Sequence, residues 1–156
     1  MLPVTHLLVG LAIGVWGLRR GLFAGEYVIY TAVVSTLIDL DHLAGYFRSG
    51  GGSMREHWNR LVLDRLRYRQ TFIHHAGGMA VTCLLIALTY GFDRSLFYCL
   101  SLAYGPHMIL DHLHLKHLPH IRRYRLKGLG VIIPYSIVEV LLDAAVIGYL
   151  VGWGLA

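Results

Sequence analysis

Residues 1–21 read MLPVTHLLVGLAIGVWGLRRG, an apolar run over Leu2–Leu18 closed by the short polar turn Leu18-Arg19-Arg20-Gly21. Four further apolar runs follow, over about 22–47, 76–92, 96–115 and 129–155. A helix needs about 20 apolar residues to cross a hydrocarbon core of about 30 Å, so the first and third runs are short. The pattern predicts an all-α integral membrane protein, a bundle of about five transmembrane helices.

Composition favours the same class. Of the 156 residues, 56% are apolar and 15% are charged, whereas an ordinary globular domain carries about 25% charged residues. We expect one transmembrane domain over residues 1–156, with the first helix retained because no basic leader precedes it. Cys83 and Cys99 lie in apolar stretches and are expected to be buried apolar side chains.

Basic residues predict the orientation of the bundle. The connections 48–73 and 112–128 contain eleven of the fourteen Lys and Arg residues. Cytoplasmic loops are rich in these residues, so we expect an inner-membrane protein with its N-terminus in the cytoplasm and its C-terminus outside. The same charges explain the pI of about 9.4 without a nucleic-acid partner, since no nucleic-acid-binding motif is present.

The first connection also contains an amphipathic pattern. Apolar residues recur at helical spacing between arginines: Met54, Trp58, Leu61, Val62 and Leu66. This spacing predicts an amphipathic helix, lying along the membrane interface or packed as an ordinary surface helix. Two pairs of glycines, Gly10-x-x-x-Gly14 and Gly148-x-x-x-Gly152, are expected to mediate helix contacts, within the bundle rather than between chains. The oligomeric state is left open.

Titratable residues gather at the ends of the runs that this topology places on the cytoplasmic side. They are His6, Asp39, Asp41, His42, His74, His75, His107, Asp111, His112, His114, Glu139 and Asp143. Asp39 and His42 share a helical face, as do His107, Asp111 and His114. Buried ionisable groups persist when they pair with one another or bind metal. Mixed imidazole and carboxylate groups favour zinc, with manganese or iron as alternatives, and we expect one to three ions.

A family resemblance follows from the order of these motifs. Thr5-His6, Ile38-Asp39-Leu40-Asp41-His42, His74-His75-Ala76-Gly77 and His107-x-x-x-Asp111 resemble the motifs of membrane-bound metal-dependent hydrolases. These are the inner-membrane, LexA-binding-type hydrolases, which are distantly similar to zinc-dependent phospholipase C and P1-type nucleases. The resemblance covers about the first 115 residues and implies a metal-ligand set of His6, Asp39, His42, His75, His107 and Asp111.

This chain departs from the family pattern at two places. Ile38 stands where the family usually has Pro, and Tyr68-Arg69 precedes Thr71 where the family has His-Arg followed by Thr-His. The role of Arg69 and the choice between His74 and His75 stay open. We prefer His75 because small residues follow it, as in the family.

The predicted function is metal-assisted hydrolysis of a phosphoester or lipid-like substrate at the membrane face, with membrane lipids as neighbours. A bound metal ion would activate water, and Asp41, Glu139 or His114 would orient groups or act as general base. Glu139 can equally be paired with a buried basic group. Alternative functions are a di-iron oxygenase built on His boxes, a metal-binding or transport protein without enzymatic activity, and a b-type haem protein.

Overall fold

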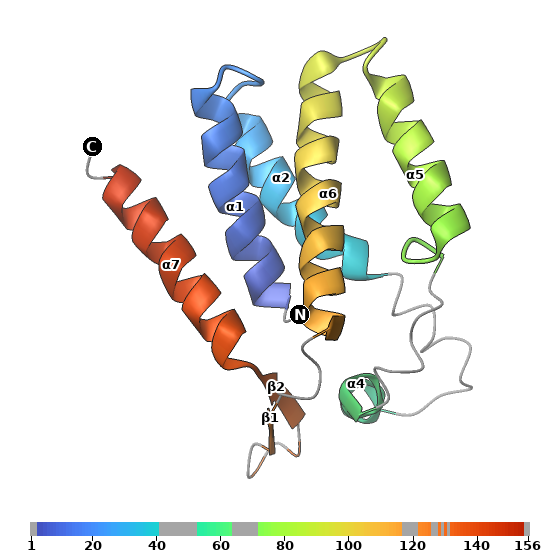
Figure 1. The fold of residues 1–156 in the computed structure, drawn as a ribbon, viewed down its shortest axis with the longest axis vertical. Helices are drawn as coiled ribbons and strands as arrows, with labels where there is room; N and C mark the ends of the chain where they lie inside the picture. The colour runs from blue at the N-terminus through green and yellow to red at the C-terminus, as the bar shows by residue number, and fades with distance from the viewer. Residues whose placement is uncertain are drawn as a thin grey trace.

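The computed structural model describes residues 3–40, 53–63, 72–116, 122–125, 128, 130 and 132–154. Its elements in chain order are α1 (Pro3–Arg19), α2 (Glu26–Leu37), the 3₁₀ turn η1 (Ile38–Leu40), α4 (Met54–Leu63), α5 (Ala76–Thr89), α6 (Arg94–Lys116), β1 (Arg122–Arg125), β2 (Ile132–Tyr135) and α7 (Ile137–Gly154). The predominantly helical character predicted from the apolar runs is therefore present (Figure 1).

The helices α1, α2 and α6 form the centre of the molecule. Each of them packs against the other two, while α7 flanks α1 and α5 flanks α6 (Figure 1). A small core of Phe23, Val28 and Cys99 fills the end of this unit near the α1–α2 turn. The opposite end of the three central helices therefore holds the first turn of α1, the end of α2 and the second half of α6.

Glycines permit the close contact between α1 and α2. A Cβ atom at Gly10 would lie 2.9 Å from Ala32 Cα, and one at Gly14 would lie 2.9 Å from the Val28 carbonyl oxygen. Only a residue without a side chain fits at these two positions. The Gly10–Gly14 pair thus mediates a contact within the chain, as predicted. At Gly148 and Gly152 an added Cβ would meet no atom of the described residues within 4 Å.

The prediction of a multi-pass membrane bundle is wrong. None of the helices in the described residues combines the length and the apolar character that crossing a membrane requires. The helices α1, α2 and α5 have 17, 12 and 14 residues, fewer than the roughly 20 that a span needs. The longest helix, α6, has 23 residues but contains charged residues and Pro106. The predicted inner-membrane localisation and orientation depended on those spans and are contradicted with them.

Two of the predicted runs also have different internal structure. The run 22–47 is α-helical only over Glu26–Leu37 and then tightens into η1, while its last residues lie outside the described part. The run 129–155 begins with β2, which pairs antiparallel with β1 from Arg122↔Tyr135 to Arg125↔Ile132. The helix α7 starts only after this hairpin, at Ile137.

The helix predicted from the amphipathic pattern is α4. Ser53 and Glu56 form a reciprocal cap at its start: the Glu56 amide donates to Ser53 Oγ at 3.2 Å, and the Ser53 amide donates to Glu56 Oε2 at 3.1 Å. Asn59 Nδ2 donates to the Gly130 carbonyl at 2.8 Å. This bond attaches α4 to the segment before β2, so α4 packs on its own chain as a surface helix.

Candidate metal centre

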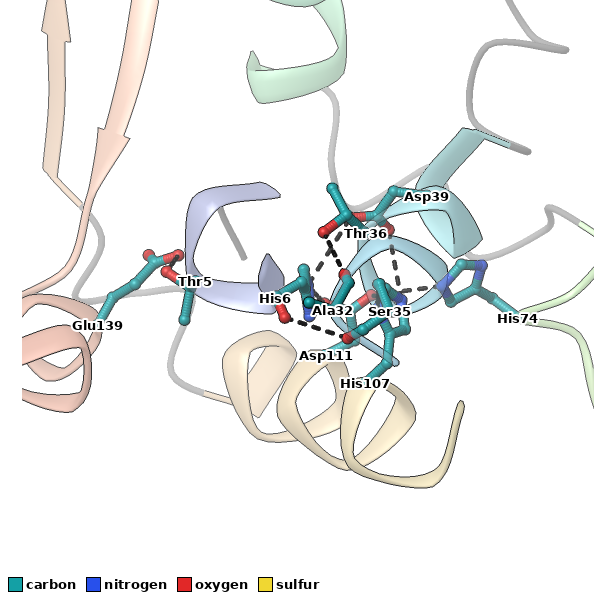
Figure 2. A network of polar contacts seen from close by, with 10 residues as sticks. All are labelled: Thr5, His6, Ala32, Ser35, Thr36, Asp39, His74, His107, Asp111 and Glu139. Carbon is teal, nitrogen blue, oxygen red and sulfur yellow. Dashed lines mark hydrogen bonds and ion pairs between the residues drawn. The ribbon is translucent and has the colours of Figure 1, made fainter. Parts of the chain in front are cut away.

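Four predicted ligands converge at the end of the central helices. His6 on α1, Asp39 on η1, and His107 and Asp111 on α6 each offer one ligand atom, and these atoms all lie within 4.8 Å of one another (Figure 2). The two imidazoles are fully buried, and the side chains of Asp39 and Asp111 are 19% and 17% exposed. The four residues form a buried group that can hold a metal ion.

Local structure explains why these side chains meet. His107 and Asp111 are four residues apart on α6, so they project from one face of the helix. The 3₁₀ turn η1 carries Asp39 past the end of α2 toward the same point. Ser35 then joins the helices, because its Oγ donates to the His6 carbonyl at 3.1 Å and its own carbonyl lies 2.7 Å from His107 Nδ1.

The imidazole nitrogens and carboxylate oxygens lie within direct contact of one another. His6 Nε2 lies 3.2 Å from Asp111 Oδ1 and 3.7 Å from Asp39 Oδ2. His107 Nε2 lies 3.4 Å from Asp39 Oδ1 and 3.6 Å from Asp111 Oδ2. Atoms bound tetrahedrally to zinc at about 2.0–2.2 Å are about 3.3–3.6 Å apart. The two imidazole rings are stacked, with centroids 4.0 Å apart.

The hydrogen bond of His107 determines which of its nitrogens faces the carboxylates. A backbone carbonyl can only accept, so His107 Nδ1 must carry the proton that it donates to Ser35. In a neutral imidazole Nε2 is then a bare lone pair, directed at the oxygens of Asp39 and Asp111. Three acceptors around one point repel each other unless a cation, either a proton on Nε2 or a metal ion, lies between them.

Both carboxylates are ionised at neutral pH. Burial opposes ionisation of Asp39, but the hydrogen bond with His107 and the nearby His6 keep its pKa below the ordinary value. Burial likewise opposes ionisation of Asp111, and hydrogen bonds with His6 and His74 hold its pKa far below the ordinary value. These lowered pKa values depend on hydrogen bonds that the imidazoles donate, so they describe the centre with a proton on the ring nitrogens that face Asp39 and Asp111.

The structure brings His74, rather than His75, to this group. His74 Nε2 lies 3.4 Å from Asp111 Oδ2, whereas His75 is exposed and its Nδ1 accepts the Gly77 amide at the start of α5. Two contacts hold the turn that carries His74. Tyr104 Oη donates to the Ile73 carbonyl at 3.1 Å, and a Cβ at Gly78 would collide with the Phe72 carbonyl oxygen.

Glu139 lies beside the centre without joining it. Thr5 Oγ1 lies 3.2 Å from Glu139 Oε1 (Figure 2). It also lies 3.2 Å from Asp143 Oδ2, so one hydroxyl of α1 is within hydrogen-bond distance of two carboxylates of α7. Burial raises the pKa of Asp143 above its ordinary value, and Glu139 adds to this rise against the effect of Thr5. Thr5 precedes His6, so the contact reaches the backbone of a ligand residue.

The remaining predicted site residues are not at the four-residue group or lie outside the described structure. His112 is exposed on α6. Asp41 and His42 lie outside the described residues, as do Arg69 and the side chain of His114. Sequence reasoning missed Ser35 and Tyr104, which hold His6, His107 and the His74 turn through backbone carbonyls. Their positions, four residues before Asp39 and three before His107, are the only signal that the sequence contains.

Comparison with known proteins gave no match: no family model, no curated protein and no solved structure is similar enough to this chain to be counted as one. The resemblance to metal-dependent hydrolases thus stays a prediction from short motifs.

Proposed function

We propose that the chain is a metal-dependent hydrolase that cleaves a phosphoester. In this proposal His6, Asp39, His107 and Asp111 bind a divalent cation, with zinc as the first candidate and manganese or iron as alternatives. Two imidazoles and two carboxylates form a ligand set that all three metals accept. His74 is close enough to Asp111 to contribute a further ligand or to hold that carboxylate in place.

The observation that carries the proposal is the orientation of His107. Histidine ligands of metals nearly always donate their second ring nitrogen to a carbonyl or carboxylate, which fixes the tautomer and directs the lone pair at the ion. His107 donates to the Ser35 carbonyl in this way and directs Nε2 at the carboxylates of Asp39 and Asp111. A buried imidazole whose second nitrogen is held by a carbonyl in this way is oriented to bind a metal ion through Nε2.

Each carboxylate contacts both imidazoles. Asp39 turns Oδ2 toward His6 and Oδ1 toward His107, and Asp111 turns Oδ1 toward His6 and Oδ2 toward His107. Each aspartate thus offers one oxygen to each imidazole. These residues would hold one divalent ion or a pair of ions, which would supply the charge for metal-assisted hydrolysis.

Metal ions supply two effects in hydrolysis: they lower the pKa of bound water toward about 7 and stabilise the charge that develops on a phosphoryl oxygen. The residues of this chain would orient those ions and keep the carboxylates ionised. Glu139, which contacts Thr5, would act as a positioning residue for the first turn of α1. The general-base roles of Asp41 and His114 stay predictions.

Element analysis of purified protein, with a hydrolysis assay, tests the proposal. We expect wild type to retain zinc, manganese or iron after dialysis and to hydrolyse bis(4-nitrophenyl) phosphate or 4-nitrophenyl phosphate. The double variant Asp39→Asn, Asp111→Asn should lose both properties while keeping its helical circular dichroism. Asp93→Asn is the matched control, since Asp93 caps the other end of α6 through the Leu96 amide and asparagine caps equally well.

Each other outcome selects a different conclusion. Metal without hydrolysis would refute the enzyme and favour a metal-binding protein. An iron pair that reacts with oxygen would favour the oxygenase. A wild type that takes up no metal after reconstitution would show that the four residues are a buried network in which protonated histidines compensate the carboxylates.

A further inference from the structure

Residues of α2, η1, α5 and α6 line an apolar pocket. Its volume is about 280 Å³, slightly below the roughly 300–1,000 Å³ of typical small-molecule sites. The wall that it presents is almost entirely apolar. Two of its hydroxyl groups are engaged within the fold, since Thr89 Oγ1 donates to the Ile86 carbonyl and Tyr104 Oη donates to the Ile73 carbonyl. The pocket therefore offers hydrocarbon contacts and few polar ones.

One end of the pocket adjoins the candidate metal centre. Ile38 lines the pocket and directly precedes Asp39, and Tyr104 lines it one helical turn before His107. Tyr104 also holds the carbonyl of Ile73, the residue before His74. Ile38 and Tyr104 are buried and bring the pocket wall close to the candidate ligands along the chain.

The other lining residues lead away from the centre. On α2 the wall continues back to Val34, and on α6 it continues back to Leu100. On α5, which starts next to His74, it runs forward from Thr82 to Thr89. Seven residues of α-helix rise about 10 Å. The lining residues therefore extend along three helices, and Ile38 and Tyr104 are the ones nearest to the candidate ligands in the sequence.

We propose that this pocket binds the hydrocarbon chain of an amphiphilic phosphoester whose phosphate group lies at the metal centre. This inference rests on the proposed function and names its substrate class. An ionic group near an apolar pocket on the same helices matches a single molecule with a charged head and an alkyl tail. A polar substrate, such as a sugar phosphate, would make no use of the pocket.

Two adjacent leucines of α5 provide a matched pair of variants. Leu85 lines the pocket and is 59% exposed, while Leu84 is 61% exposed and is not part of the pocket wall. Replacing either residue by tryptophan adds the same bulk at a similarly exposed position, so neither change should prevent folding. Only Leu85→Trp places that bulk at the pocket.

The experiment measures binding rather than turnover. Methyl-, butyl- and octylphosphonate, which cannot be hydrolysed, are titrated calorimetrically into wild type, Leu85→Trp and Leu84→Trp, below the micelle concentration and with and without zinc. Each fully buried methylene contributes about fourfold in affinity. For this partly open pocket we expect octylphosphonate to bind wild type and Leu84→Trp at least about tenfold more tightly than methylphosphonate. In Leu85→Trp this preference should fall to about threefold or less.

Two results would overturn the inference. Equal affinities across the series in wild type would show that the pocket takes no chain. An equal loss in both tryptophan variants would place the chain on the outer face of α5. A different result would count against the proposed function. In that case binding would not depend on zinc and 4-nitrophenyl phosphate would not be hydrolysed, while affinity could still depend on the length of the alkyl chain.

Discussion

Replacement of Gly10 by alanine tests whether the close contact between α1 and α2 positions His6. The added Cβ would lie 2.9 Å from Ala32 Cα and 2.9 Å from Ser35 Cβ. The first of these atoms is backbone, so no side-chain rotation relieves the contact. The second belongs to the residue that binds the carbonyl of His6 and the ring of His107. The two helices must therefore move apart at the level of the metal centre.

The magnitude follows from two opposing effects. Overpacking of a close contact costs about 1–3 kcal/mol, while alanine is a better helix former than glycine by about 1 kcal/mol. Gly148→Ala on α7 gains only the second effect, because an added Cβ there meets no atom of the described residues within 4 Å. The difference between the two variants isolates the contact, and we expect about 1–3 kcal/mol, or about 2–12 °C in Tm.

Thermal unfolding of the metal-free variants, followed by circular dichroism, measures this difference. Titration with zinc gives a second readout, since displacement of His6 should weaken binding in Gly10→Ala and leave Gly148→Ala at the wild-type affinity. Equal Tm values for the two variants would refute the close approach of α1 and α2. Unequal Tm values with equal zinc affinities would refute the link between that contact and the ligands.

Three further predictions address single contacts. Gly78→Ala should weaken zinc binding about ten- to hundredfold, because the added Cβ displaces the turn that carries His74. Gly77→Ala has space for a Cβ and should bind zinc like wild type. Equal zinc affinities of the two variants in a titration would contradict this prediction. Hydrogen bonds from the Leu96 amide and the Tyr27 hydroxyl lower the pKa of Asp93. Asp93→Ala should therefore reduce Tm at neutral pH, and this reduction should disappear as the pH falls below 3.8. A reduction of Tm that persists at low pH would contradict this prediction. Burial raises the pKa of Asp143, so Asp143→Asn should increase Tm at neutral pH. In thermal scans this increase should disappear as the pH falls toward 3.8. A lower Tm of the variant at neutral pH would contradict the raised pKa.

Apolar runs in the sequence located most of the helices but not their setting. The runs Leu2–Leu18, 76–92 and 96–115 correspond to α1, α5 and α6 within a few residues. The interpretation of these runs as spans was wrong, because none of the described helices combines the length and the apolar character that a span requires. The shortening of α2 by η1 and the hairpin before α7 arise from tertiary contacts that periodicity does not report.

The meeting of four of the six predicted ligand residues was predictable from helix direction. Alternating helices bring the start of α1, the end of α2 and the second half of α6 together, which places His6, Asp39, His107 and Asp111. The choice between His74 and His75 depends instead on a turn held by Tyr104 and by the space at Gly78. Glu139 was expected at the centre because α7 starts on that side, but α7 flanks α1, and Glu139 therefore contacts Thr5.

A metal ion bound at the candidate centre would also stabilise the fold. The four residues come from three elements far apart in the sequence, and the charge of Asp111 opposes ionisation of Asp39 across the site. A cation between them would turn this repulsion into attraction and connect α1, η1 and α6, so its binding free energy would add to the folding free energy. The residues that bind the metal in the proposed reaction would then also hold α1, α2 and α6 together, near the close contact of α1 and α2 at Gly10 and Ser35. Loss of activity in a ligand variant is therefore informative only beside a measurement of its folding.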